Sequence, residues 1–158
     1  MKKQKGFSLI ELLIVVAIIL IIAAIAIPNL LRSRMAANEA SAVGSLRTIN
    51  TAEVTFATTY PTIGFASLTA LGGAAPCTSA TSTAACLLDD VLSASAATKS
   101  GYKFAVTAGT QTPVVTYSST ATPTVIGQSG QRGFYSDQSG VIRYTTDGTA
   151  PTNASPAL

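Results

Sequence analysis

The feature that most constrains this chain is an unbroken apolar run near its N-terminus. From Leu12 to Ile27 no side chain carries a polar group. Phe7 to Ile27 is 21 residues, and a helix of this length is about 31 Å long, which matches the roughly 30 Å hydrocarbon core of a bilayer. The run is therefore long enough to cross a membrane. Glu11 lies at its edge, where a carboxylate is costly and usually has a function.

Charge and composition exclude several classes of protein. The net charge of +3 comes from Lys2, Lys3 and Lys5, and the remaining chain is neutral, so the basic balance does not indicate nucleic-acid binding. The chain contains no His, which removes the usual general base and the commonest metal ligand. Charged residues are 11% of the chain, against about 25% in a typical soluble domain. We expect a membrane or envelope protein with no enzymatic activity, cofactor or metal.

Cysteine and carboxylate pairs in the second half of the chain suggest structural roles. Cys77 and Cys86 are the two cysteines, and their spacing does not match that of zinc ligands. In an exported chain they are expected to form a disulfide that closes a small surface loop. Asp89 and Asp90 lack the spacing of a calcium-binding loop and are expected at a helix terminus or in a loop.

Three interpretations of the N-terminal segment remain open on physical grounds. It resembles a secretory signal cut after Ala26, because Ala24-Ile25-Ala26 follows the small-x-small cleavage pattern. It is also long enough to be a single-span anchor. The third is a prepilin-type leader, cut on the cytoplasmic side before the apolar segment, which leaves the apolar helix on the mature chain. Arg32 and Arg34 follow the segment and weaken the charge asymmetry that would orient it.

A second helical pattern follows Pro28, a residue that we expect to kink or locally open the helix. Residues with spacings of three and four predict one buried face, apolar except for Glu53: Ala42, Leu46, Ile49, Glu53, Phe56 and Tyr60. Tyr60-Pro61 ends the pattern, because a residue before proline avoids the helical region. A helix from Phe7 to about Thr59 is near 80 Å long, too long for this domain to bury. Its first half therefore needs another packing partner.

The remainder of the chain is predicted to form a small head. Residues 61–100 are predicted to form a long connection with short helical turns at 67–71 and 87–93. The tail at 147–158 is expected to be loose. Strand patterns occur between residues 101 and 146: Tyr102 to Thr107, Val114 to Tyr117, Phe134 to Ser136 and Val141 to Thr145. The last two flank the hairpin loop "DQSG". The fold class is α+β, a long N-terminal spine helix packed on a small antiparallel β-sheet head.

The stretch "KGFSLIELLIVVAIILIIAAIAIPNL", Lys5 to Leu30, resembles the N-terminus of type IV pilins and pseudopilins. The resemblance implies a leader at 1–6, a hydrophobic transmembrane and assembly helix at 7–31, an amphipathic helix at 32–60 and a globular head at 61–158. It implies cleavage between Gly6 and Phe7, N-methylation of Phe7, and roles for Glu11 and Pro28 in assembly.

The function implied is that of a structural subunit of a type IV pilus. Such a subunit is stored as a single-pass protein of the inner membrane and polymerised through its N-terminal helix into a surface filament. Its partners are copies of itself, a prepilin peptidase and methylase, and an inner-membrane assembly platform. Two alternatives stay open: the major pseudopilin of a type II secretion system, which builds a periplasmic fibre, and a secreted binding domain released after Ala26.

Overall fold

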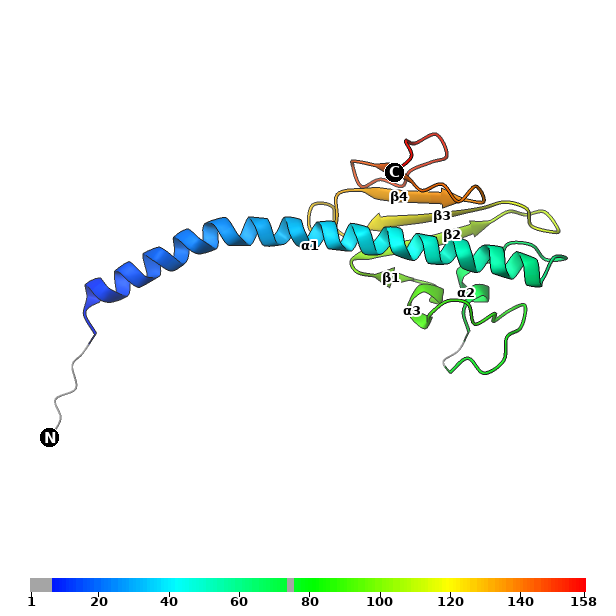
Figure 1. Ribbon diagram of the computed structural model, residues 1–158, viewed down its shortest axis with the longest axis horizontal. Coiled ribbons are helices and arrows are strands. Elements are labelled where there is room, and N and C mark those ends of the chain that lie inside the picture. Colours follow the sequence, from blue (N-terminus) through cyan, green and yellow to red (C-terminus); the bar gives the residue numbers. More distant parts are fainter. Residues whose placement is uncertain (1–6, 74–75) are drawn as a thin grey trace. The chain divides into compact units, whose positions relative to one another are not determined.

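The computed structural model describes residues 7–73 and 76–158 of the chain, which divides into two compact units, Met1–Arg34 and Met35–Leu158. Helix α1, Leu9–Thr59, contributes to both units (Figure 1). The second unit also contains two short helices and five strands: α2 (Leu68–Leu71), α3 (Asp90–Ser93), β1 (Thr98–Lys99), β2 (Tyr102–Ala108), β3 (Tyr117–Pro123), β4 (Gly133–Asp137) and β5 (Arg143–Thr145).

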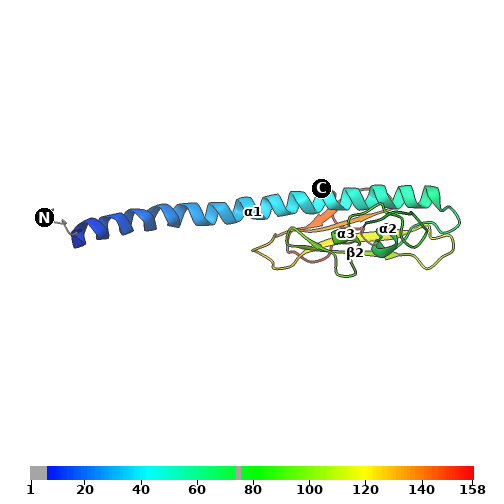
Figure 2. The ribbon, with the colours of Figure 1, turned by 90° about the horizontal axis from the view of Figure 1, so that it is seen from below.

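The five strands form one antiparallel sheet in the order β1-β2-β3-β4-β5, so each strand pairs with its neighbours in sequence. The part of α1 that belongs to the second unit lies against one face of this sheet (Figure 2). Alternate residues of the strands point toward α1 and are buried, among them Tyr102, Phe104, Tyr117, Ala121 and Phe134. The predicted α+β class, a long helix packed on a small antiparallel sheet, is confirmed.

The helical face predicted from the spacing of residues forms the core of the second unit. Ala42, Leu46, Ile49 and Phe56 are fully buried, and Glu53 is buried with them. Tyr60 packs against this core from just beyond the helix. The helix ends at Thr59, where Pro61 prevents its continuation. The predicted face and the predicted end of the helix are both confirmed.

Helix α1 runs through Pro28 without interruption, so the local opening, one of the two outcomes predicted there, is absent. A proline inside a helix removes one backbone hydrogen bond, and the adjacent turns continue the helix on either side of the gap. In the single chain, the expected opening of the helix at Pro28 is therefore not present.

Strand β3 overlaps the segment where the sequence predicted it only at Tyr117. Val114 forms an isolated bridge with Gly64, in the loop after α1, and the strand begins only at Tyr117. It continues through small polar residues to Pro123, because both of its edges are paired, with β2 and with β4. Pairing on two sides outweighs the weak strand propensity of its serines and alanine.

The structure also differs from two smaller predictions, the start of strand β5 and the looseness of the tail. Strand β5 begins at Arg143, later than the predicted Val141, and the 138–142 loop is correspondingly longer. The tail, expected to be loose, is hydrogen-bonded to this strand region near its end: Tyr144 N donates to Pro156 O, and Leu158 N donates to Ile142 O. The tail thereby covers the edge of β5, whose backbone groups would otherwise be unpaired.

Candidate functional site

The start of α1 is fixed by a pair of residues that the sequence analysis did not connect. Ser8 directly precedes the helix, and its carbonyl accepts the first helical hydrogen bond, from Leu12 N at 3.2 Å. The backbone N–H of Ser8 donates to Glu11 Oε2 at 3.1 Å. This is the reciprocal half of a capping box, in which a glutamate three residues after the cap satisfies its free N–H. The Ser-x-x-Glu spacing in the sequence indicates it.

The carboxylate of Glu11 therefore has an intrachain role in this structure. It satisfies one donor at the helix N-terminus, where a negative charge is also favoured by the helix dipole. Phe7 lies outside the helix and is 78% exposed. The nitrogen of Phe7 is a peptide nitrogen here, since the chain is intact, and a free amine at this position exists only after cleavage. Gly6, the predicted last residue of the leader, lies outside the described residues.

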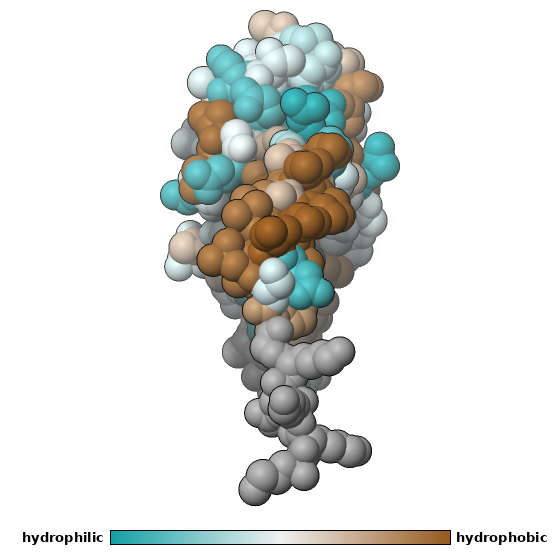
Figure 3. Space-filling model, turned by 90° about the vertical axis from the view of Figure 1, so that its left-hand side faces the viewer, coloured by the Kyte–Doolittle hydropathy of each residue, from teal (hydrophilic) through white to brown (hydrophobic). Residues whose placement is uncertain are grey.

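The apolar side chains of the first unit are exposed to solvent. From Leu9 to Leu31 the large hydrophobic side chains keep between 46% and 76% of their surface accessible. Figure 3, viewed from the N-terminal side, shows this apolar surface. Among the described residues α1 is the one helix long and apolar enough to cross a membrane. So large an apolar surface marks a site of contact with lipid or with other protein chains.

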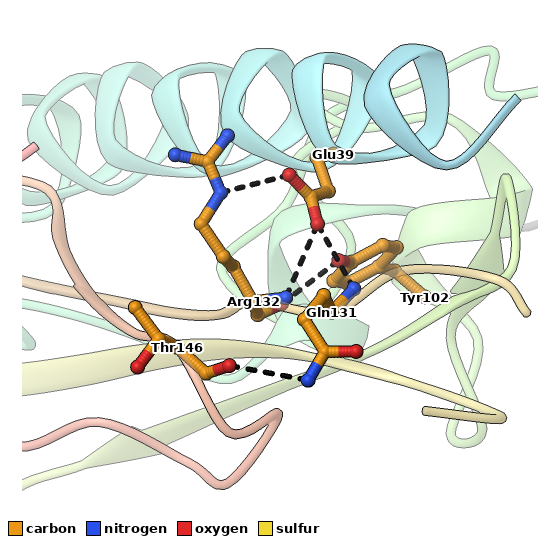
Figure 4. Close-up of polar contacts among 5 residues, drawn as sticks. All are labelled: Glu39, Tyr102, Gln131, Arg132 and Thr146. Atoms are coloured by element: carbon orange, nitrogen blue, oxygen red, sulfur yellow. Dashed lines mark hydrogen bonds and ion pairs between the residues drawn. The ribbon is translucent and has the colours of Figure 1, made fainter. Parts of the chain in front are cut away.

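A polar cluster around Glu39 fastens α1 to the loop between β3 and β4 (Figure 4). Glu39 Oε1 accepts from the backbone N–H groups of Gln131 at 2.9 Å and Arg132 at 3.1 Å, and Oε2 pairs with Arg132 Nε at 2.8 Å. The Tyr102 hydroxyl donates to Arg132 O at 2.8 Å. Burial raises the pKa of Glu39, but these hydrogen bonds and the arginine charge outweigh it and lower the pKa overall.

The guanidinium of Arg132 also lies over two aromatic rings of the sheet. Its central carbon is 5.5 Å from the centre of the Phe134 ring and 5.8 Å from that of Tyr144. Cation–π contacts of this kind add to the ion pair with Glu39. The cluster joins α1 to residues more than 90 positions away along the chain, and for this reason nothing in the sequence predicted it.

The predicted structural residues of the loop region are found where expected. Cys77 and Cys86 form a disulfide. Asp89 is the N-cap of α3: its side chain accepts from Leu92 N at 2.9 Å, and it pairs with Lys99. Within the described part of the chain no cluster of His, Cys, Asp or Glu is suited to hold a metal.

Comparisons with known proteins bear on the N-terminal segment. A family model described as the prokaryotic N-terminal methylation motif matches residues 1–27. The chain carries this methylation motif. It is 64% identical over 39 residues to the type IV wide pilus major component PilA4 of Thermus thermophilus. It is 46% identical over 54 residues to the type IV major pilin protein PilA of Myxococcus xanthus. No solved structure matches the chain.

These matches confirm the resemblance to type IV pilins over the N-terminal segment. The aligned segments cover 25% and 34% of this chain, and the chain spans only 30% and 24% of the length of the two relatives. The names of both relatives describe structural components of pili. This agrees with the expectation that the chain is a structural protein rather than an enzyme.

Proposed function

We propose that this chain is a structural subunit of a type IV pilus. The observation that carries the proposal is the exposed apolar segment Leu9 to Leu31, most of which lies within the matched methylation motif at residues 1–27. Removing this segment from water is favourable by about 25 cal/mol per Å² of apolar surface. The lipid of the inner membrane covers the segment in the monomer, and the helices of neighbouring subunits cover it in the filament. The membrane stores the monomer, and polymerisation exchanges lipid contacts for helix contacts.

Processing converts the stored chain into one that assembles. A prepilin peptidase cuts between Gly6 and Phe7 and removes Lys2, Lys3 and Lys5 with the leader. The amine of Phe7 is then methylated and remains cationic. Assembly also requires an inner-membrane platform that extracts the subunit. The finished filament lies on the cell surface, built of copies of the same chain.

Glu11 is proposed to set the register between subunits. In the intact chain the Oε2 of the Glu11 carboxylate accepts a hydrogen bond from the Ser8 N–H. In a filament core that charge needs a cationic partner, since an unpaired buried charge is strongly destabilising. The Phe7 amine of a neighbouring subunit supplies one. A single polar pair in an apolar interface is well suited to fix the axial position of one helix against another.

Three substitutions at Glu11 test this proposal and separate pairing from capping. Glu11→Gln keeps an acceptor for the Ser8 N–H but has no charge, whereas Glu11→Asp keeps the charge on a shorter side chain. We expect Glu11→Ala and Glu11→Gln to be inserted and cut at Gly6 but to form no filaments, and Glu11→Asp to form few. Filament yield after shearing is compared with the mature subunit held in the membrane, by immunoblot. Wild-type filament yield from Glu11→Gln would show that the charge is not required.

The runner-up is the major pseudopilin of a type II secretion system. The acidic and Gly-rich pattern that this family often carries after the spine helix is absent, and "TTYPTIGFASL" stands in its place. Electron microscopy of intact cells separates the two functions, because a pilus extends from the surface whereas a pseudopilus at normal expression stays within the periplasm.

A further inference from the structure

A second site lies in the head, on the face of the sheet that points away from α1. There, a hollow of about 340 Å³ is open to solvent. Three residues that pair across adjacent strands line it, Thr107 of β2, Ser118 of β3 and Asp137 of β4. Because paired residues of neighbouring strands point to the same face, their polar groups form one continuous row.

Three further lining side chains come from separate segments. Tyr135 stands two residues before Asp137 on the same face of β4, Gln138 begins the turn after β4, and Asn153 comes from the tail. Tyr135 and Asp137 are near neighbours: burial raises the pKa of the Tyr135 hydroxyl, and the Asp137 carboxylate adds to the effect. The hollow thus combines the Tyr135 ring with hydroxyl, amide and carboxylate groups.

Most of these polar groups are unused within the molecule. In residues 7–73 and 76–158, the side chains of Thr107, Ser118, Gln138 and Asn153 make no hydrogen bond with the rest of the chain. Asp137 is the exception: its Oδ1 accepts from the backbone N–H of Ser139 at 2.9 Å and from the Ser139 hydroxyl, and its carboxylate lies close enough to the Tyr135 hydroxyl to raise the pKa of that group. A convergent set of free donors and acceptors is what a polar ligand needs.

The chemistry of the lining selects one class of ligand. No Lys or Arg lines the hollow, and its one charged side chain, Asp137, repels an anionic ligand. A single carboxylate is too few ligands for a metal ion, and an apolar ligand would leave the amides and hydroxyls unpaired. A neutral ligand with many hydroxyl groups fits. Its hydroxyls exchange hydrogen bonds with the amides and carboxylate, while its C–H face lies on the electron-rich face of the Tyr135 ring.

We propose that this hollow is a binding site for neutral saccharides, with Tyr135 as the stacking platform and Asp137, Gln138 and Asn153 as hydrogen-bonding partners. Binding at this site needs no assembly of the chain. On a filament whose helices form the core, it gives each subunit a weak contact for glycans. Many copies along one filament then act together, and avidity raises the total affinity well above that of one site.

The test uses the full chain, solubilised in a detergent without a sugar head group. The probes are glucose, galactose, mannose, N-acetylglucosamine, cellotetraose and chitotetraose, each followed by saturation-transfer NMR and titration. We expect at least one probe to bind with a dissociation constant on the order of 1 mM. Glucuronic acid, an anionic probe, is expected to bind more weakly than glucose.

The variants place the binding in the hollow. Tyr135→Ala is expected to weaken binding by at least about 10-fold, as the loss of a central aromatic anchor does. The double variant Gln138→Ala/Asn153→Ala removes side chains that make no internal hydrogen bond in the described residues. It therefore tests binding in the hollow if Tyr135→Ala is poorly folded, and it is expected to bind the probes more weakly than wild type. Thr122→Ala, on the same sheet face but outside the hollow, is the matched control and is expected to bind as wild type. The proposal is overturned if no probe binds wild type, or if the folded variants bind as wild type does.

Discussion

Replacing Glu53 with glutamine is expected to stabilise the head at and above neutral pH. Glu53 is fully buried on α1. Its Oε2 accepts from Ala66 N at 2.9 Å, and its Oε1 has no hydrogen-bond partner in the described part of the chain. Burial raises the pKa of Glu53 from 4.5 to about 7, although the hydrogen bond from Ala66 acts in the opposite direction. Among the residues that the structure describes, no cation offsets the cost of the charged form.

The sign and size of the effect follow from proton linkage. Between pH 4.5 and about 7 the folded chain keeps the proton of Glu53 while the unfolded chain has lost it. The free energy of unfolding therefore falls as pH rises through this range and levels off above it. Each pKa unit corresponds to 1.36 kcal/mol, so the loss is about 3 kcal/mol at pH 8. Glutamine keeps the acceptor for the Ala66 N–H and does not titrate, so it avoids this loss.

Urea denaturation of the full chain in detergent, between pH 4.5 and 8, measures the effect. All five tyrosines lie at residue 60 or beyond, so near-ultraviolet circular dichroism reports on the head. We expect Glu53→Gln to be about as stable as wild type at pH 4.5 and about 3 kcal/mol more stable at pH 8. Equal stability of the two proteins at pH 8, or a difference that does not change with pH, would refute the reasoning.

Three further substitutions, one of them with a matched control, test other parts of the head by the same denaturation assay. Glu39→Gln is expected to lower the free energy of unfolding by about 1–3 kcal/mol at neutral pH. Because the pKa of Glu39 is lowered in the folded chain, this difference from wild type should disappear as pH falls below about 4.5. A difference that does not change with pH would contradict the reasoning. Asp89→Ala should cost about 1 kcal/mol as the loss of an N-cap, whereas the neighbouring Asp90→Ala should be nearly neutral. Cys77→Ser is expected to cost under about 3 kcal/mol and to preserve the fold, and alkylation of the unreduced wild type should label neither cysteine.

Local patterns in the sequence predicted the elements whose structure is decided locally. The spacing of Ala42, Leu46, Ile49 and Phe56 identified the buried face of α1, because burial on one side of a helix requires that period. Alternation of apolar and polar residues identified β2 for the same reason. The methylation motif was recognisable because its residues are contiguous.

Features that depend on distant partners were not predictable. Strand β3 has few strand-favouring residues and exists because β2 and β4 pair with both of its edges. In the sequence, nothing distinguishes Glu39 from any other polar residue of a helix. Its role in binding Gln131 and Arg132 depends on the fold, which brings these distant residues beside it. The hollow around Tyr135 likewise requires strand register and the path of the tail, which sequence spacing does not specify.

The capping pair at the start of α1 is an intermediate case. Ser8 and Glu11 have the spacing of a capping box, so this part of the site was available to sequence analysis. The prediction for Glu11 rested instead on the cost of a carboxylate at the edge of the apolar run. The structure adds that the carboxylate is already bonded to the Ser8 N–H before any second chain is present.

The central claim, that the apolar helix is kept and assembles, is tested most directly by the intact mass of protein sheared from the cell surface. Residues 7–158 with one added methyl group and one disulfide are expected, with fragmentation placing the methyl group on the amine of Phe7. A mature chain that begins at Ile27 would contradict the account, because the helix proposed to form the filament core would then have been removed.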